Sequence, residues 1–187
     1  MSITAPITFE QFEKLQLPES RKWELHEGEL VEMPPPSFLH KVVQHRLYEL
    51  LKPLFQGKAV VLTEMPISMK DKKNDYRSMD VGVLSVDRAP LTADQRLVNG
   101  APELVIEVLS PSNTAGEIAA RKRFCLENGA EMFAVVDAVE LDVTVTYRSD
   151  PARTEHYGLG SSVPIRALGV EAELPVDAIF EGITSGE

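Results

Sequence analysis

The sequence predicts an α/β (α+β) fold in which helices flank a central mixed β-sheet. Strand patterns dominate from residue 59 to residue 147, and a helical pattern separates two buried strands there. Hydrophobic residues make up 43% of the chain and charged residues 26%, as in ordinary globular proteins. We expect residues 1–187 to form a single domain, with a core of about 8–148 and C-terminal strands and a loop over 149–187.

The first predicted elements are a short helix, a hairpin and a long helix. A capping-box pattern that begins at Thr8 predicts a helix to about residue 15. Alternating residues on both sides of a Glu-Gly turn predict a hairpin over residues 22–33. Apolar residues recur at helical spacing from Phe38, so an amphipathic helix should follow and end near residues 53–57.

Strands dominate the rest of the chain. Candidate strands lie at 59–64 and 67–69, separated by Pro66, then at 80–84 and 104–109, with a helical turn near 93–95 between the last two. A helix capped by Asn113 or Thr114 should run to residue 128. The remaining strands are expected at 131–137, 141–147, 155–157 and 163–165, and a loop-rich end follows them.

Glu107 is the most informative residue because it lies inside an otherwise aliphatic strand, 104–109. An ionised carboxylate in such a strand loses its water, at a cost of several kcal/mol unless something pairs with it. A buried cationic side chain, a raised pKa or a bound cation could compensate. A structural salt bridge and a metal ligand are therefore both open interpretations.

Asp80 opens the strand at 80–84 and could approach Glu107 if the two strands are neighbours. Gly82 shares a face with Asp80 and is expected to leave room for an ion and its waters. Two hard oxygen ligands without a Cys or His cluster favour Mg²⁺ or Mn²⁺ over zinc. Such a cation can activate a water and stabilise charge on a phosphate. A residue that merely caps a turn is the alternative for Asp80.

Arg121, Lys122 and Arg123 lie on the helix that follows the Glu107 strand, and part of this cluster can face the carboxylates. Arg123 fits a solvated face, and a surface pair with Glu117 could explain Arg121. Lys122 shares a helical stripe with apolar residues, which predicts that it leans inward. Both Arg121 and Lys122 stay open as groups that orient water or hold a phosphate.

Glu24 lies in the first strand of the predicted hairpin, and an edge-strand position and an accessory role at a metal are equally open for it. Weaker candidates lie elsewhere in the chain: His40 and His45, expected to be exposed on the long helix, and Glu64 and Glu103. Two serines fit turn positions better than nucleophiles, because no partnering His–Asp arrangement is apparent: Ser110 and Ser112.

Charge and cysteine content limit the partners and the compartment. The net charge of −10 argues against broad attraction to nucleic acid, although it allows a local basic patch. Cys125 is the only cysteine, so a reducing cytoplasm is the expected compartment. We expect no secretory signal and no membrane association, because no apolar stretch approaches the length that spans a bilayer.

Several motifs in this order resemble the Uma-two family of restriction-endonuclease-like proteins over roughly residues 8 to 148. They are the Trp23–Val31 segment, Ser37 and His40 after the Pro-rich stop, Met79-Asp80-Val81, the Ala101–Ser112 segment, and Gly129–Asp137. The Glu-Val-Leu-Ser-Pro-Ser stretch is the most specific of them. The resemblance implies a PD-(D/E)XK nuclease fold with a central mixed sheet, flanking helices and a divalent-metal site.

The resemblance also implies roles for individual residues. Asp80 takes the place of the first metal-binding acid, after Met79 where the family usually has Pro, and Glu107 takes the place of the second. We include Val108, next to Glu107, among the expected metal-binding positions. Glu24 matches an early acidic position of the family and is expected to assist the metal.

The family's lysine position is the main departure. The lysine of the standard nuclease motif, two residues after Glu107, is Leu109 here. In this family the lysine is expected on the following helix, eight residues before a glycine, and Arg121 occupies that position with Lys122 beside it. Arg can position a phosphate but is a far poorer proton donor or acceptor than Lys. Turnover therefore depends on whether Lys122 substitutes.

These expectations lead to one main functional hypothesis and two alternatives. The main hypothesis is a Mg²⁺- or Mn²⁺-dependent endonuclease that hydrolyses DNA phosphodiester bonds, with the catalytic residues Asp80, Glu107, Lys122, Arg121 and Glu24. The acidic charge predicts weak DNA affinity, which a homodimer could raise. The first alternative is a catalytically impaired nucleic-acid-binding or regulatory module of the same fold. The second and weaker alternative is a structural protein whose acids form internal ion pairs.

Overall fold

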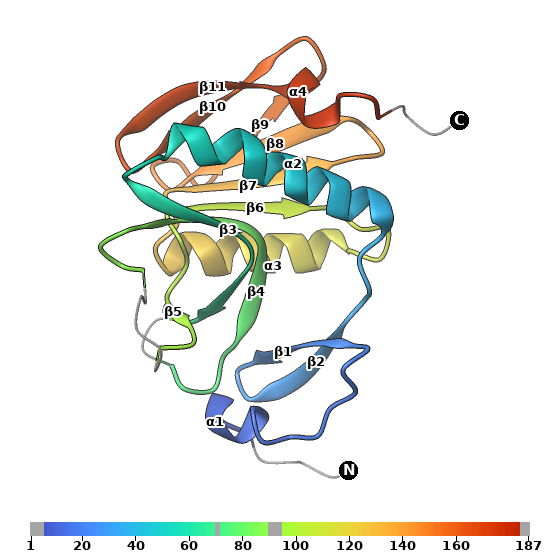
Figure 1. The fold of residues 1–187 in the computed structure, drawn as a ribbon, viewed down its shortest axis with the longest axis vertical. Coiled ribbons are helices and arrows are strands. Elements are labelled where there is room, and N and C mark those ends of the chain that lie inside the picture. Colours follow the sequence, from blue (N-terminus) through green and yellow to red (C-terminus); the bar gives the residue numbers. More distant parts are fainter. Residues whose placement is uncertain (1–5, 70–71, 90–94, 184–187) are drawn as a thin grey trace.

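A seven-stranded mixed sheet forms the centre of the computed structural model, which describes residues 6–69, 72–89 and 95–183 (Figure 1). Its strands are β3 (Ala59–Ser68), β4 (Arg77–Ser85), β5 (Val98–Asn99), β6 (Leu104–Val108), β7 (Met132–Asp137), β8 (Asp142–Tyr147) and β9 (Glu155–Tyr157). They are ordered β5-β3-β4-β6-β7-β8-β9, with β3–β5 and β6–β7 parallel and the other pairs antiparallel. The predicted mixed sheet is confirmed.

Two helices cover opposite faces of this sheet, α2 (Phe38–Leu54) and α3 (Ala115–Glu127). Successive side chains of a strand point to opposite faces, and β6 separates the two cores in this way. Leu104, Ile106 and Val108 belong to the core that α2 covers, whereas Val105 belongs to the core that α3 covers. None of the helices in the described part of the chain is long and apolar enough to span a bilayer.

The capping signals read from the sequence locate the helix starts well. Thr8 caps α1 (Phe9–Phe12) in a complete capping box, although this helix ends three residues earlier than predicted. Ser37 caps α2, and Thr114, rather than Asn113, caps α3 through a second capping box with Glu117. The start of α3 fixes which of its residues face the sheet.

The hairpin of β1 (Lys22–His26) and β2 (Glu29–Met33) also forms as predicted, as a separate two-stranded sheet. Its turn residues Glu27 and Gly28 have φ of 50° and 91°. Positive φ at both central residues is typical of the tight turns that match strand twist. The hairpin packs beside β4 through a bridge between Leu25 and Tyr76.

Two expectations about the elements are wrong. Pro66 does not break β3, because most of β3 has only β4 as a neighbour, and a proline is tolerated on such an edge. The C-terminus is not loop-rich: β10 (Ser162–Ala167) and β11 (Val170–Pro175) form a hairpin and α4 (Val176–Phe180) follows. These elements bury apolar residues against the core under α2. The helical turn expected at 93–95 falls mainly outside the described residues.

The pairing of β4 with β6 brings the two predicted acids together. Val81 is paired with Ile106 and Val83 with Leu104, so continuing this register places Asp80 opposite Glu107. The room beside Gly82, however, is filled by protein rather than left for an ion. A Cβ atom at Gly82 would lie 2.7 Å from Met65 Sδ and 3.1 Å from Pro102 Cγ.

We therefore expect Gly82→Ala to destabilise the protein by about 1–3 kcal/mol through overpacking. Gly158→Ala is the matched control, because a Cβ atom at Gly158 meets nothing within 4 Å. Denaturant unfolding of both variants measures the effect. A Gly82→Ala protein with unchanged stability but lost Mn²⁺ binding would show instead that Gly82 makes room for an ion.

Candidate functional site

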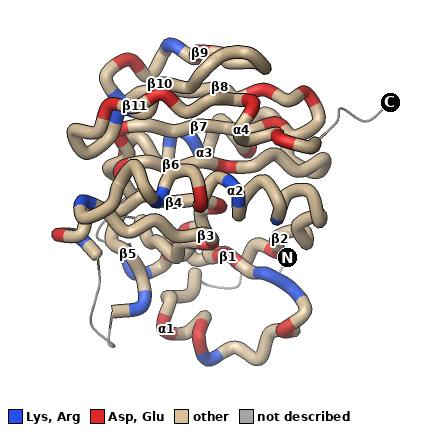
Figure 2. Tube along the Cα trace, turned by 45° about the horizontal axis from the view of Figure 1, so that its top comes forward, with Lys and Arg blue, Asp and Glu red and all other residues tan. Residues whose placement is uncertain are grey.

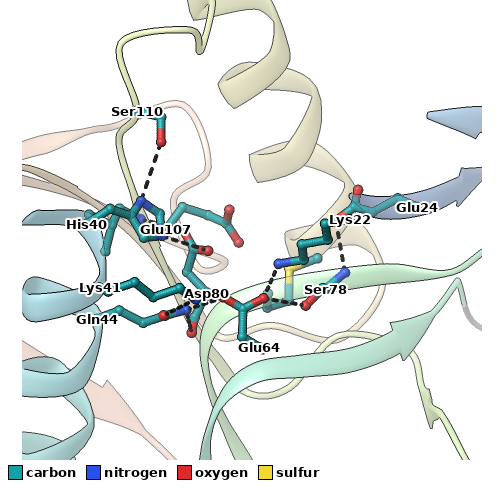
Figure 3. Close-up of polar contacts among 12 residues, drawn as sticks. Lys22, Glu24, His40, Lys41, Gln44, Glu64, Ser78, Asp80, Glu107 and Ser110 are labelled. Atoms are coloured by element: carbon teal, nitrogen blue, oxygen red, sulfur yellow. Dashed lines mark hydrogen bonds and ion pairs between the residues drawn. The ribbon is translucent and has the colours of Figure 1, made fainter. Parts of the chain in front are cut away.

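A cavity of about 470 Å³ lies where the β1–β2 hairpin, the start of α2, strands β3, β4 and β6, and α3 meet. Four carboxylates, two arginines, a lysine and a histidine are among its lining residues: Glu24, Glu64, Asp80, Glu107, Arg77, Arg121, Lys22 and His40. Figure 3 shows many of them converging from separate elements. The acids singled out in the sequence therefore share one cavity.

Asp80 is held by contacts to both of its carboxylate oxygens. The Val108 N–H donates to Oδ2 at 2.9 Å, and His40 Nε2 lies 3.3 Å from Oδ1. The N–H and C=O groups of one strand residue point to the same side. The carbonyl of Val108, its only group suited to a cation, therefore also faces Asp80.

Glu107 is buried, and one of its oxygens has no partner. Its Oε2 lies 3.6 Å from Arg121 Nε, whereas Oε1 is one of two buried, unpartnered side-chain N or O atoms among the described residues. Burial raises the pKa of Glu107 to about 8. The positive charge of Arg121 opposes this rise, and the negative charges of Asp80 and Glu24 add to it.

Arg121 binds Glu24 more tightly than it binds Glu107. One guanidinium nitrogen donates to both Glu24 oxygens at 2.9 and 3.2 Å, and the other donates to the Ser78 carbonyl at 3.1 Å. Burial alone would raise the pKa of Glu24, but hydrogen bonding from His26, the charge of Arg121 and the Ser78 N–H lower it to about 2. Burial also acts to lower the pKa of Arg121, and Glu107 and Glu24 more than reverse this effect.

These contacts bear on both interpretations of the acids. The salt bridge expected as an alternative exists, because Arg121 pairs with Glu24 and, at a longer distance, with Glu107. Glu107, with its unpartnered oxygen, lines the same cavity as Asp80. Within the described ranges no group of three or more His, Cys, Asp or Glu side chains has metal-binding geometry. Mg²⁺ is compatible with this, because it is often bound through one or two carboxylates and keeps several waters.

The helix α3 separates the neighbouring cations that the sequence left open. Arg121 faces the acids, so the surface pair with Glu117 is not needed to explain it. Lys122 is half-buried but points away from the acids: its Nζ lies 3.4 Å from Thr154 Oγ1, at a second cavity of about 400 Å³. Adjacent helical residues differ by about 100° around the axis, so only one of the two can point into the cavity. Arg123 is exposed.

Glu24 has a different position from the one expected for an accessory metal ligand. It is completely buried, and both oxygens are shared between Arg121 and either Ser78 or His26. These contacts make Glu24 the anchor of Arg121. Glu103 lies apart from the cavity and binds Arg88 at 2.8 Å, which is a structural pair.

His40 and Ser110 are positions that the sequence reasoning undervalued. His40 is buried rather than exposed, and its Nδ1 lies 3.4 Å from Ser110 Oγ (Figure 3). A Ser110 hydroxyl that donates to Nδ1 leaves the ring proton on Nε2, which faces Asp80. Ser110, His40 and Asp80 therefore lie in contact in this order, although no such arrangement was apparent in the sequence. The contact with His40 orients Asp80. His45, by contrast, is exposed as expected.

A mixed sheet with two acids on adjacent strands places the chain among nuclease-like folds of the restriction-endonuclease type. The family model described as "Uma2: Putative restriction endonuclease" matches residues 9–177. The chain therefore belongs to this family, which confirms the resemblance.

One solved structure and the curated proteins give two further comparisons. The fold is similar to the crystal structure of "a putative nuclease belonging to DUF820" from Anabaena variabilis, with a TM-score of 0.78 and 23% sequence identity. The similarity covers 96% of this chain and 100% of the other. No curated protein matches the chain.

We expect Arg121→Ala to destabilise the protein by about 3–5 kcal/mol, because it leaves Glu24 and Glu107 buried without their cation. Arg21→Ala is the control: Arg21 pairs with Glu32 at 2.7 Å, but both side chains are largely exposed, so the loss should be about 1 kcal/mol or less. Denaturant unfolding gives both values. Equal losses of unfolding free energy in the two variants would show that Arg121 does not compensate the buried charges of Glu24 and Glu107.

Proposed function

We propose that this protein is a divalent-metal-dependent endonuclease that hydrolyses DNA phosphodiester bonds. The observation that carries the proposal is the unpartnered, buried Glu107 oxygen in the same cavity as Asp80. Membership of a restriction-endonuclease family supports the same reaction class. Asp80, Glu107 and the Val108 carbonyl would hold Mg²⁺ or Mn²⁺, which supplies an activated water and stabilises charge on the phosphate.

The protein's own side chains prepare the site for this chemistry. His40 and the Val108 N–H fix the carboxylate of Asp80 from two directions. Arg121 partly neutralises Glu107 while Glu24 keeps the guanidinium in place. Arg121 therefore contributes positive charge near the reacting phosphate. It is not suited to carry a proton, because a guanidinium stays protonated.

A catalytically impaired binding or regulatory module of the same fold is the second candidate. The observation that favours it is the position of the cations. Arg121 replaces the family's expected lysine and is already bound to Glu24, and Lys122 faces a different cavity. Neither of these two cations on α3 is thus positioned to exchange a proton in the cavity. Metal binding without cleavage would identify this second function.

Nicking of supercoiled plasmid separates the two functions. We expect nicked DNA with Mg²⁺ or Mn²⁺, none with EDTA, and none from Asp80→Asn or Glu107→Gln. Calorimetric titration with Mn²⁺ should give binding to the wild type and none to either variant. Mn²⁺ binding without nicking would support the binding module, and absence of both would contradict the metal site itself.

Glu107→Gln should also separate stability from function. It removes a buried carboxyl that is crowded by Asp80 and Glu24, so the metal-free variant should unfold at an equal or higher denaturant concentration than the wild type. Mn²⁺ at about 100 times its dissociation constant should stabilise the wild type by about 2.7 kcal/mol and leave the variant unchanged.

Glu103→Gln is the matched control for that measurement, because Glu103 is as buried as Glu107, each at 7% exposure. Glu103 has an arginine partner outside the cavity. The Glu103→Gln variant should be less stable than the wild type, but Mn²⁺ should still raise its free energy of unfolding. A Glu107→Gln variant that is strongly destabilised would mean that Glu107 serves as a structural ion-pair partner rather than a ligand.

A further inference from the structure

Two lysines from distant parts of the chain meet on one carboxylate at the edge of the cavity. Lys22 of β1 pairs with Glu64 Oε2, and Lys41 of α2 lies 2.7 Å from Glu64 Oε1 (Figure 3). Gln44 and Ser78 also donate to this carboxylate, at 2.8 and 3.3 Å. Neither lysine was a candidate in the sequence, because they are 19 residues apart and belong to different elements.

The backbone at Glu64 is unusual for the middle of a strand. Its φ is 52°, in the left-handed region, although its neighbours Thr63 and Met65 both pair regularly with β4. A non-glycine residue in this conformation costs on the order of 1 kcal/mol or more, and such strain clusters at functional sites. The register places Glu64 across from Asp80, so this strained position lies next to a predicted metal ligand.

Gln44 connects the lysine cluster to Asp80. Its buried side-chain amide donates to Glu64 Oε1 at 2.8 Å and to the Asp80 carbonyl at 2.7 Å. The two lysines are therefore held at a fixed place relative to the strand that carries Asp80. A group bound by the lysines would lie beside the acids, not elsewhere on the surface.

The two arginines that line the cavity are already paired with carboxylates. Arg121 and Arg77 have side-chain exposures of only 11% and 12% and face Glu24 and Asp75. Lys22 and Lys41 are 33% and 45% exposed. An ammonium group has three N–H donors. The described hydrogen bonds use one N–H donor of Lys22 and two of Lys41, so each ammonium group can donate a further hydrogen bond to an anion.

We propose that Lys22 and Lys41 form a phosphate-binding site that holds the DNA backbone beside the acids, and that Glu64 is the positioning residue for both. This inference rests on the proposed nuclease function and names the residues that bind its substrate. Two ammonium groups around one carboxylate leave a net positive charge. The chain as a whole carries −10, and Figure 2 shows its Lys and Arg scattered among acidic positions, so a local site of this kind is what phosphate contacts require.

The test is DNA affinity without cleavage, measured by fluorescence anisotropy of a labelled duplex in EDTA at several KCl concentrations. We expect Lys22→Met and Lys41→Met each to weaken binding severalfold and to lower the salt slope by about 1. Lys52→Met is the matched control on α2, because Lys52 lies near the other end of this helix, over the Tyr48 ring rather than paired with Glu64, and should bind as the wild type does. Mn²⁺ affinity should stay unchanged in all three variants.

Charge-preserving variants keep the test decisive if a methionine variant is unstable. Lys22→Arg and Lys41→Arg should retain the affinity and the salt slope, and a loss equal to that of the methionine variants would overturn the inference. Glu64→Gln should weaken DNA binding and keep the salt slope, because both ammonium groups remain but lose the carboxylate that holds them beside the acids. Binding by this variant as tight as the wild type, or tighter, would overturn the role given to Glu64.

Two outcomes distinguish the inference from the proposed function. A wild type that nicks and binds DNA, with lysine variants no weaker than Lys52→Met, would overturn the phosphate site and leave the nuclease in place. A wild type that neither binds DNA nor nicks it with metal would overturn both. The phosphate site would be supported if DNA affinity fell severalfold only in Lys22→Met and Lys41→Met and Mn²⁺ binding stayed unchanged.

Discussion

The contact on which the candidate site depends is the buried guanidinium of Arg121 between Glu24 and Glu107. A buried acid is tolerated only when a cation or several hydrogen bonds compensate for the water it has lost. Arg121 shares this compensation with His26 and the Ser78 N–H at Glu24, and it supplies it only partly to Glu107. The incomplete pairing leaves Glu107 with an unpartnered oxygen and a pKa raised to about 8 by burial. The same contact thus leaves incompletely paired the acid that we propose as a metal ligand.

The β1–β2 hairpin is a structural part of this site, although it lies outside the seven-stranded sheet. Lys22 and Glu24 are two residues apart on β1, so their side chains project from the same face. Glu24 binds Arg121 of α3, and Lys22 binds Glu64 of β3. The strand β1 therefore carries both the carboxylate that binds Arg121 and the ammonium group that binds Glu64. A shift of the hairpin would disturb both the acids and the proposed phosphate contact.

The arrangement also explains how a strongly acidic protein could act on a polyanion. Three acids of the cavity are buried, Glu24, Asp80 and Glu107, whereas two partly exposed ammonium groups gather on Glu64: Lys22, which lines the cavity, and Lys41. Gln44 ties the two groups of residues together through Glu64 and the Asp80 backbone. A phosphate held at the edge would be oriented toward the acids without a broad basic surface. The DNA binding that we propose would therefore be weak, local and dependent on orientation.

The sequence by itself determined the local elements and the identity of the two central acids. Capping boxes, a Glu-Gly turn and aliphatic runs depend on neighbouring residues, and an acid such as Glu107 inside an apolar strand is conspicuous without coordinates. The tertiary structure alone decided which side chains meet. Arg121 rather than Lys122 faces the acids because adjacent helical residues point about 100° apart, and a shift of one residue in helix phase would exchange them. The burial of His40 and the convergence of Lys22 on Glu64 join segments far apart in the chain, and such contacts are set by how the layers pack, which no local pattern encodes.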